Sequence, residues 1–487
     1  MTNLVKGKTG DWEVVIGLET HAQIISNSKM FSGSKVNFGD EPNNNVSFID
    51  AGYPGVLPSP NEFCVKQAII AGLALNGNIN LTSYFDRKHY FYPDSPLGYQ
   101  ITQFYVPIME HGFFNIDTKD GVKKIGINRL HIENDAGKLM HEHHKTKSFV
   151  DLNRAGTGLM EIVSEPDFRS KEEVADYVNK LRTLLKTLGV CDGNMEEGSL
   201  RCDVNISVRK PGEKFRNRVE IKNMNSIKFI MQAIDYEVAE HIKTWESGGE
   251  IVQQTKLFNP SEGRTYTLRT KEDAGDYRYV REPDILPLVL EQSYVDGIKA
   301  SLPEFPDDKK NRYITQFGLH KDDALLLTNE RENADFFEES LKYNISKNPK
   351  SVASFIITNL FAFLNSNSVE LKNSPITPKM IGELVDLIDN KTISSKIAKE
   401  VFEIMWNNKT PQSPADIVKE RGLVQITDTS AIEAIVKKVA DANPDKIAEI
   451  KAGKDKLIGW FVGQVMKESQ GKANPDLVNE LLKKYIG

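Results

Sequence analysis

NRLHIENDAGKLMHEHHKTKSFVDLNRAGTGLMEIVSEP, residues 128–166, is the stretch that decides the fold. Two runs in it alternate apolar and polar side chains, as a β-strand with one buried face does. The apolar members of these runs are Leu130, Ile132, Met160 and Ile162. We therefore expect an antiparallel sheet with these four residues on its core face and with His131, Glu133 and Glu161 on the opposite face. A face this acidic usually meets a cation.

Other runs extend the same polar face. Residues 12–18 predict a strand that delivers Glu19 and His21 to one side, and residues 200–209 and 219–222 alternate in the same way. The candidates for one acidic, cation-holding cavity are Glu19, His21, Glu133, Asp135, Glu161, Glu196, Glu197 and Glu220. Carboxylates suit Mg²⁺ or Ca²⁺, and a histidine ligand also admits Mn²⁺. The alternative is that these are solvated charges on an exposed sheet face.

Basic side chains near these runs are candidates for phosphate or carboxylate recognition, because Arg presents a planar fork and Lys a point charge. They are Arg87, Lys88, Arg154, Arg201 and Arg209. Each of them alone also fits an ordinary surface residue. The histidine-rich tract at 141–147 offers possible metal ligands, but it falls where a hairpin should turn, so we predict a solvated tip.

Composition limits the classes of protein. At 487 residues, two or three domains are expected. A net charge of -6 argues against bulk electrostatic attachment to nucleic acid, although a local basic face is still possible. Three widely spaced cysteines fit neither a disulfide framework nor a zinc site, so we expect a reducing, cytoplasmic setting. No apolar run predicts a signal peptide or a membrane span.

The periodicity changes along the chain. Helices are predicted from Ser170 to Gly189 and from Ser226 to Gly248, and a hairpin around residues 259–263, which makes the first part α+β and largely antiparallel. Residues 302–308 read as a linker, and residues 410–414 as a second break. Helices are predicted after the linker near 307–317, 330–345, 349–365, 377–389, 393–407, 414–421, 430–441, 445–451, 455–470 and 475–485.

Several catalytic signatures are absent from the sequence: a Walker A loop, a GxGxxG fingerprint and a GxSxG elbow. If ATP is used, acidic residues and metal must hold its phosphates. No cysteine or serine nucleophile with a partner base is evident, so amide hydrolysis is not indicated. A lysine-rich terminal segment could bind a phosphate backbone through Lys451, Lys454, Lys456, Lys467 and Lys472. The alternative is an ordinary helix with Trp460 in its core.

Seven motifs carry a family resemblance that runs in order through the chain. They are VIGLETHAQ (15–23), FDRKHYFYPDSPLGYQITQF (85–104), RLHIENDAGK (129–138), DLNRAGTGLMEIVSEPD (151–167), MEEGSLRCDVNISVR (195–209), EIKNMNS (220–226) and KEDAGDYRYVREPDI (271–285). With these motifs the chain resembles the B subunits of aspartyl/glutamyl-tRNA(Asn/Gln) amidotransferases, the GatB family.

The resemblance implies a glutamine-synthetase-like cradle at 1–293, a helical domain at 294–410 and a YqeY-like, tRNA-binding tail at 411–487. The implied activity converts Glu-tRNA(Gln) or Asp-tRNA(Asn) to Gln-tRNA(Gln) or Asn-tRNA(Asn), using ATP and Mg²⁺, or Mn²⁺, to form an acyl phosphate. Metal would neutralise the two anionic substrates before phosphoryl transfer. Ammonia would come from glutamine hydrolysed by an amidase A subunit, with a small C subunit bracing the pair.

The resemblance also suggests roles for residues. It places Glu19, His21, Glu133 and Glu161 in the motifs that hold metal, and Lys88 where ammonia enters the cradle. To the catalytic set we add Asp135 and Arg154. To ATP or its phosphates we assign Glu196, Glu197, Arg201, Asp203 and Glu220.

One position departs from the family pattern. The family usually has Glu-Glu-Asp where this chain has Glu133-Asn134-Asp135. The second acid of that pattern is implicated in metal binding or in a gate opposite the lysine. Asn134 cannot ionise, so Asp135 or a water would replace the acid, or the gate would be uncharged.

Two other classes of function stay open on sequence alone. A non-catalytic RNA-binding scaffold would need no acidic set. A free-standing glutamine-synthetase-like ligase for a small amino acid would not need the long helical tail. The sequence also leaves open whether the product is Gln-tRNA, Asn-tRNA or both.

Overall fold

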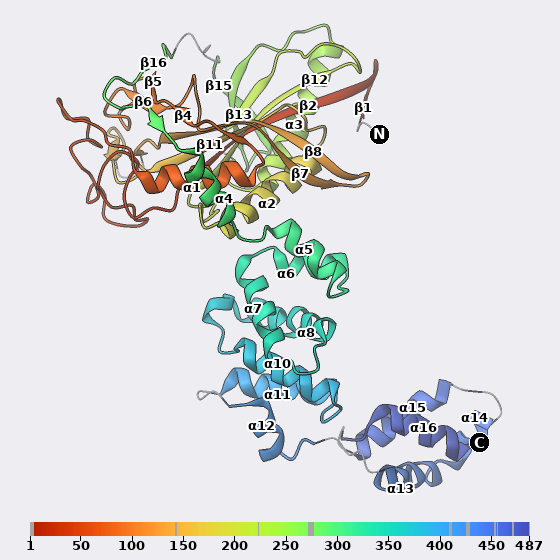
Figure 1. Ribbon diagram of the computed structural model, residues 1–487. Helices are drawn as coiled ribbons and strands as arrows, with labels where there is room; N and C mark the ends of the chain where they lie inside the picture. The colour runs from red at the N-terminus through yellow and green to blue at the C-terminus, as the bar shows by residue number, and fades with distance from the viewer. Residues whose placement is uncertain are drawn as a thin grey trace. The chain divides into compact units, whose positions relative to one another are not determined.

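The computed structural model describes residues 4–141, 144–222, 224–270, 277–408, 412–424, 429–451, 454, 456–469 and 472–486. The chain divides into two compact units, Met1–Phe305 and Pro306–Gly487 (Figure 1). In the described residues the first unit mixes a large sheet with helices and the second is helical. This confirms the predicted α+β class with a helical part after it. No helix of the described chain combines the length and apolar content needed to cross a bilayer.

The first unit is built on one ten-stranded sheet in the order β15-β14-β13-β12-β2-β11-β8-β7-β3, with β1 paired to β2. Its strands are β1 (Leu4–Gly7), β2 (Gly10–Gln23), β3 (Asn78–Ile79), β7 (Met109–Thr118), β8 (Gly121–Asn134), β11 (Gly158–Ser164), β12 (Leu200–Arg209), β13 (Val219–Lys222), β14 (Gln254–Asn259) and β15 (Arg264–Thr270). Apart from the parallel pair β13–β14, neighbouring strands are antiparallel.

The register of the central strands confirms the predicted faces. Met160 of β11 pairs with Ile132 of β8, and both are buried in the core. Glu161, one residue on, pairs with His131 of β8 and with His21 of β2. Because side chains alternate across a strand, this register places the apolar residues under the sheet and the charged residues on its other face.

Shorter strands form three small sheets. β5 (Asp86–His89) pairs with β6 (Tyr99–Thr102) and with β16 (Val280–Arg281). β4 (Thr82–Ser83) pairs with β17 (Leu288–Val289), and β9 (Lys138–Met140) with β10 (Phe149–Asp151). The histidine tract joins β9 to β10, and its described residues are exposed, as expected of a hairpin tip; residues 142 and 143 lie outside the described chain.

Helices α1 (Glu62–Ala74), α2 (Lys171–Thr187) and α3 (Ile227–Glu246) pack against the sheet and share one core with it. Ser170 caps α2 by accepting from the N–H of Glu173, and Ser226 caps α3 by accepting from that of Phe229. These two capped helices begin where the sequence predicts.

Helix α4 (Gln292–Ala300) is not predicted by the sequence. It lacks a side-chain cap and contains Gly297, so it carries little local signal. Val295 and Ile298 bury it in the core of the first unit, Met1–Phe305.

The described residues of the second unit contain all ten helices predicted after the linker, together with one α-helix that is not predicted, α6. The helices are α5 (Pro306–Thr315), α6 (Lys321–Thr328), α7 (Arg331–Lys342), α8 (Pro349–Phe355), a π-helical turn (Ile356–Leu360), α9 (Phe361–Asn367), a 3₁₀ turn (Leu371–Asn373), α10 (Pro378–Asp389), α11 (Ser395–Asn407), α12 (Pro414–Glu420), α13 (Thr429–Asp441), α14 (Pro444–Lys451), α15 (Lys456–Glu468) and α16 (Pro475–Ile486). The predicted 349–365 helix is continuous through the π turn.

The second unit holds two separate apolar cores. One extends from Tyr313 to Val418 and the other from Ile432 to Leu482. Ile417 and Val418 of α12 are buried in the first of these cores. Residues 409–411 of the expected break lie outside the described chain.

Candidate functional site

A cavity of about 650 Å³ lies on the polar face of the sheet. The predicted residues that line it are Glu19, His21, Lys88, Glu161 and Glu220. They come from β2, β5, β11 and β13, so strands far apart in the sequence deliver them to one place. These five residues are therefore gathered at one cavity and are not spread over an exposed sheet face.

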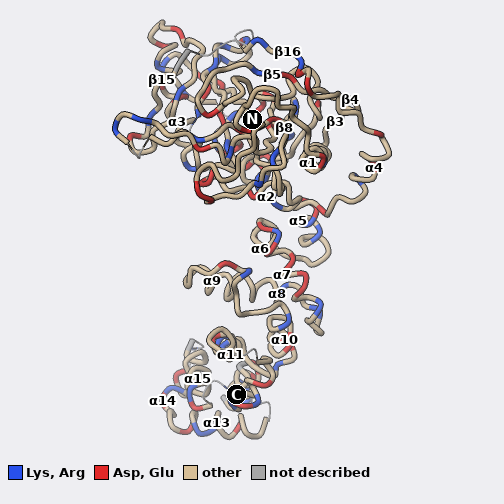
Figure 2. The backbone as a smooth tube through the Cα atoms, turned by 90° about the vertical axis from the view of Figure 1, so that its left-hand side faces the viewer, with Lys and Arg blue, Asp and Glu red and all other residues tan. Residues whose placement is uncertain are grey.

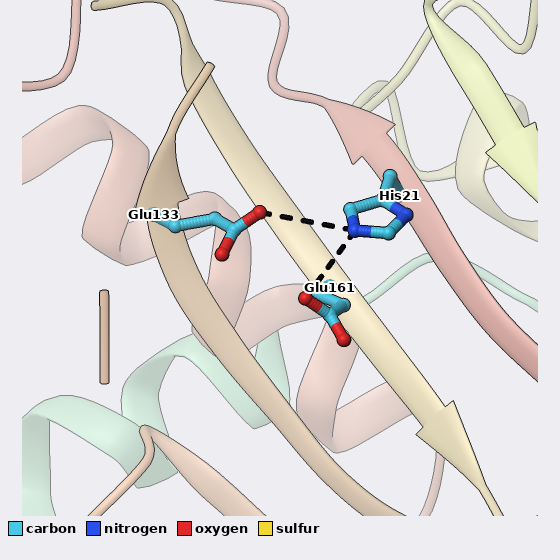
Figure 3. Close-up of side chains that lie close together, drawn as sticks. All are labelled: His21, Glu133 and Glu161. Atoms are coloured by element: carbon cyan, nitrogen blue, oxygen red, sulfur yellow. Dashed lines mark ion pairs between the residues drawn. The ribbon is translucent and has the colours of Figure 1, made fainter. Parts of the chain in front are cut away.

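The first cluster contains two histidines and two glutamates; His21, His131 and Glu161 line the cavity, and Glu133 is buried beside them. His21 Nε2 lies 3.3 Å from Glu161 Oε2 and 3.9 Å from Glu133 Oε1 (Figure 3). His131 Nε2 lies 3.2 Å from Glu161 Oε2 and 3.5 Å from Glu133 Oε2. The Thr102 hydroxyl donates to Glu133 Oε2 over 3.3 Å. The side chain of Glu161 is thus the point on which the two rings converge.

Electrostatics in this cluster favour charged rings. Burial alone would lower the pKa of His131, but the carboxylates of Glu161 and Glu133 raise it to about 9. The pKa of His21 is also raised, mainly by Glu161 against the effect of burial. Burial would raise the pKa of Glu161, yet the two histidines hold it well below its usual range. The charged form of the two rings would thus balance the acids that a metal ion would otherwise neutralise.

The second cluster lies on the neighbouring strands β2, β12 and β13. Asp203 of β12 pairs in register with Glu19 of β2, and Glu220 projects from β13. Lys222 reaches into this cluster: its Nζ contacts Asp203 Oδ2 and lies 3.1 Å from Glu220 Oε1. Asn205 Nδ2 donates to Glu19 Oε1 over 3.0 Å, and the Thr255 hydroxyl donates to Glu220 over 2.8 Å.

Among the described residues, two groups of three have the geometry for a cation. One is His21, Glu133 and Glu161, and the other is Glu19, Asp203 and Glu220; within each, the ligand atoms lie within 4.8 Å of one another. The four residues expected to hold metal are therefore divided, because Glu19 belongs to the second group. Burial, together with Glu161 and Glu220, raises the pKa of Glu19, as crowded carboxylates should.

Lys88 projects into the cavity among aromatic rings. Its Nζ lies 5.1 Å from the centre of the Tyr277 ring, and Tyr90 and Tyr279 line the same wall. Burial opposes the charged form, but Glu133 and the tyrosines raise the pKa of Lys88 above its ordinary value. A cation held this way is available to an anion entering the cavity.

The segment that carries Tyr277 and Tyr279 is fastened to β5. Arg87 forms two hydrogen bonds with the buried Glu282, Nε to Oε2 and Nη2 to Oε1, each 2.8 Å long. His89 N–H donates to the Tyr277 carbonyl, and the Tyr279 ring stacks on Phe104 at 3.9 Å. The Arg87–Glu282 pair thus positions one wall of the cavity.

Three predicted residues form a separate network beside the cavity. Asp135 Oδ2 lies 3.1 Å from Arg201 Nη2 and 3.7 Å from Arg154 Nε. Arg154 also donates to the carbonyls of Ala136 and Gly137. None of these three charged side chains lines the 650 Å³ cavity, so their geometry is that of a brace for the loop after β8.

Glu196 and Glu197, expected at ATP, lie away from the cavity. Both are exposed in the turn before β12, where their N–H groups donate to Asn194 Oδ1. The alternation of β12 begins only at Leu200, after a turn in which Gly198 has φ +80°. Glu196 and Glu197 lie in this turn, before the strand, so the alternation of the strand does not direct their side chains toward the site. Their assignment to ATP stays a prediction.

Asn134, where the resemblance leads us to expect an acid, is engaged with the backbone. Its Oδ1 accepts from the N–H of Ile101 over 2.8 Å, and its carbonyl accepts from Gln100 Nε2 over 2.9 Å. The side-chain amide of Asn134 therefore links β8 to β6, and its Oδ1 is already occupied by the hydrogen bond from Ile101. Asp135 does not take its place opposite Lys88, because it pairs with the arginines described above.

Several residues of the site are not predicted from the sequence. His131 is predicted on the polar face but not in the site, and Lys222 is predicted only as a strand residue. Their period-two spacing from Glu133 and Glu220 could have found them. Tyr277 and Tyr279 come from a distant segment, and no local signal connects them with Lys88.

A second cavity of about 300 Å³ adjoins the first and shares Glu19, Val163, Arg218 and Gln253 with it. Asn205, Ser207 and the exposed Phe215 also line it. The Glu19 cluster therefore lies between two spaces, one lined by histidines and tyrosines and the other with an aromatic ring at its edge.

The tail lysines differ in their surroundings. Lys451, Lys454 and Lys467 are exposed, Lys472 is half-buried, and the side chain of Lys456 lies outside the described chain. Trp460 packs against the terminal core, with the Lys446 ammonium 4.2 Å from its ring. Figure 2 shows acidic residues interleaved with basic ones around α13, α14 and α15.

Comparison with known proteins places the chain in a family. Residues 14–296 match the family model described as the GatB/GatE catalytic domain, and residues 335–486 match one described as the GatB domain. A protein of Granulibacter bethesdensis, named as the B subunit of an aspartyl/glutamyl-tRNA(Asn/Gln) amidotransferase, is 54% identical over 488 residues, covering 100% of both chains. One of the same name from Acidiphilium cryptum is 55% identical over 100% of this chain and 99% of its own.

Proposed function

Because the chain belongs to the GatB family of tRNA-dependent amidotransferase subunits, we propose that it is the subunit that amidates the misacylated tRNA. The substrates would be Glu-tRNA(Gln), Asp-tRNA(Asn) or both. The observation that carries the proposal is the convergence of two carboxylate clusters and Lys88 on one cavity. An activity that joins two anions needs this kind of cation-binding site.

The proposed reaction has two balanced steps. The side-chain carboxylate of the esterified Glu or Asp attacks the γ-phosphorus of ATP, which forms an acyl phosphate and releases ADP. Ammonia then attacks the acyl carbon and loses a proton while inorganic phosphate leaves, which gives the amide. Positioning and charge neutralisation dominate phosphoryl transfer, so no protein nucleophile is required.

The residues present fit a hard divalent cation. His21, Glu133 and Glu161 would hold one ion, with a histidine that admits Mn²⁺ as well as Mg²⁺, and the all-carboxylate set Glu19, Asp203 and Glu220 would hold a second. When bound, such ions would neutralise the phosphates and the reacting carboxylate. Lys88 would add a positive charge at the wall where ammonia enters.

The architecture of the first unit supports this assignment. Its antiparallel sheet cradles the cavity, which favours a glutamine-synthetase-like catalytic unit, and the terminal core favours a YqeY-like tail. The 300 Å³ cavity would receive the nucleoside of ATP, with a base against Phe215 and the phosphates directed past Arg218 to the Glu19 cluster.

The relatives' names describe one subunit of an enzyme that acts on tRNA, so partners are part of the proposal. An amidase A subunit would supply ammonia from glutamine, and a small C subunit would complete a heterotrimer.

The three cysteines of this chain are buried, and burial raises their pKa values to about 11 for Cys64 and about 12 for Cys191 and Cys202, which disfavours a thiolate nucleophile here. The cytoplasm is the expected compartment.

The test is amidation by the complex of this chain with its A and C partners, supplied with ammonium chloride instead of glutamine. We expect ATP-dependent conversion of misacylated tRNA, with one ADP formed per amide. Product analysis after deacylation would decide between glutamine and asparagine. Amide formation without ADP, or ADP formation with no amide on either tRNA, would contradict the proposal.

Replacement of the exposed tail lysines should weaken tRNA binding. Converting Lys451, Lys454 and Lys467 to alanine removes positive charge from α14 and α15 and the segment between them. Each lysine that contacts a phosphate should reduce the slope of log affinity against log salt by about one. Filter binding across a salt series measures this slope.

The matched control converts three exposed lysines on α11 and α12 to alanine. They are Lys396, Lys399 and Lys419. This variant should retain its salt dependence. An equal change of slope in both triple variants would show that the tail holds no particular tRNA contact.

A further inference from the structure

Lys222 occupies a position that the reaction outlined above does not use. Strand β13 places Glu220 and Lys222 two residues apart, so both project from the same face of the sheet. Asp203 lies on the neighbouring strand, one position beyond the Val204–Ile221 pair. Lys222 Nζ contacts Asp203 Oδ2 and lies 3.1 Å from Glu220 Oε1. The ammonium is therefore seated among the acids of the second cluster.

The charges of this cluster explain why a cation is needed there. Glu19, Asp203 and Glu220 bring ligand atoms within 4.8 Å of one another. Glu19 and Glu220 each receive a neutral hydrogen bond, from Asn205 and Thr255. Neutral donors do not cancel the negative charge of these carboxylates, whereas the Lys222 ammonium offsets one such charge directly. Burial opposes the charged form of Lys222, but the same acids raise its pKa above the ordinary value.

We infer that Lys222 is the resident cation of the Glu19–Asp203–Glu220 cluster, and that a divalent ion arriving with nucleotide displaces it. The inference rests on the proposed function, because it assumes that the reaction brings metal and ATP to this cavity. Lys222 acts as a positioning residue: it keeps the three acids together before the substrates arrive and excludes a free metal ion from them.

Displacement of Lys222 is physically reasonable. An ammonium and a divalent ion repel each other, so they cannot share three closely placed carboxylates at low cost. The lysine side chain has a flexible four-carbon stem, and Lys222 lines the 650 Å³ cavity, which leaves the ammonium room to turn. Released from the acids, it would meet a phosphate oxygen of the nucleotide. Metal binding at this cluster would thereby depend on nucleotide.

The consequence is an asymmetry between the two clusters. The first is faced by His21 and His131, whose imidazole rings are a kind of group that can itself bind a metal ion. The second is balanced by a lysine, whose ammonium has no lone pair and can only leave. Without nucleotide, the first cluster should therefore accept a metal ion more readily than the second.

The test is a titration of the assembled complex with Mn²⁺ in the absence of nucleotide. Electron paramagnetic resonance measures the concentration of free Mn²⁺ at each point. Complex made with the natural chain should bind one Mn²⁺ to this subunit. Complex made with Lys222→Met should bind a second ion at least about tenfold more tightly than the natural complex does. Adding Asp203→Asn to Lys222→Met should remove that second ion, which assigns it to this cluster.

Two controls keep the result interpretable. Lys228→Met changes an exposed lysine of α3, and Lys222→Arg keeps the charge; both should bind Mn²⁺ as the natural chain does. Identical isotherms for the natural chain and Lys222→Met, or a second ion in Lys222→Arg, would overturn the inference. A second ion in the natural chain would also overturn it. Amidation without any Mn²⁺ or Mg²⁺ bound would instead contradict the metal role in the proposed function.

Discussion

Glu161→Gln should reduce ATP-dependent amidation by about a thousandfold. Glu161 is the carboxylate on which the rings of His21 and His131 converge, at 3.3 and 3.2 Å. The amide keeps the size of the side chain but removes its negative charge. Both imidazoles then lose their main counter-charge, and the first group of cation ligands loses one of its three members. The rate of product formation with ammonium chloride measures the effect directly.

Glu172→Gln provides a matched control, because Glu172 is an exposed glutamate on α2, away from the cavity. It should leave the rate unchanged, and both variants should retain the circular dichroism of the natural chain. Mn²⁺ binding should weaken only in Glu161→Gln. A folded Glu161→Gln variant with more than about a tenth of the natural rate would remove Glu161 from the catalytic machinery.

Glu282→Ala should destabilise the first unit by about 3 kcal/mol, at the lower end of the range for breaking a buried ion pair. Glu282 is 1% exposed and accepts two hydrogen bonds from Arg87. Removing it leaves a guanidinium that is only 23% exposed without its bidentate partner. Urea unfolding of the natural chain and of the variant measures this loss as a difference in the free energy of unfolding.

Asp284→Ala separates this effect from a general loss of charge. Asp284 also pairs with Arg87, at 3.1 Å, but its side chain is 38% exposed, so its removal should cost about 0.5 kcal/mol. Amidation should fall in Glu282→Ala as well, because the segment that carries Tyr277 and Tyr279 is held by this pair. Equal stabilities for the two variants would show that Arg87 does not depend on Glu282.

The part of the fold that follows from periodicity was predictable. Leu130 and Met160 alternate with charged residues, and one register satisfies both strands, so the faces of the central sheet could be assigned from sequence. The helices of the second unit follow similarly from apolar spacing and end signals. α4 and α6 lack a side-chain cap, and only tertiary packing reveals them.

The candidate site was predictable only where strands carry it. Glu19 and His21 could be placed together because they are two residues apart, but the division of the acids into two clusters depends on which strands are neighbours. The position of Glu196 could not be foreseen, because a turn interrupts the alternation before Leu200. Tyr279 joins Lys88 through contacts between segments nearly two hundred residues apart, and no local pattern encodes such a contact.

The register of β11 has an evolutionary consequence. Within seven residues this strand alternates core side chains with the Glu161 carboxylate, and it pairs with β2 on one edge and β8 on the other. Inserting or deleting one codon here would exchange the two faces, exposing methionine and isoleucine to the substrates and burying a glutamate among hydrocarbons. Lineages carrying this gene can therefore vary the loops in length, but the length of this strand must be inherited unchanged.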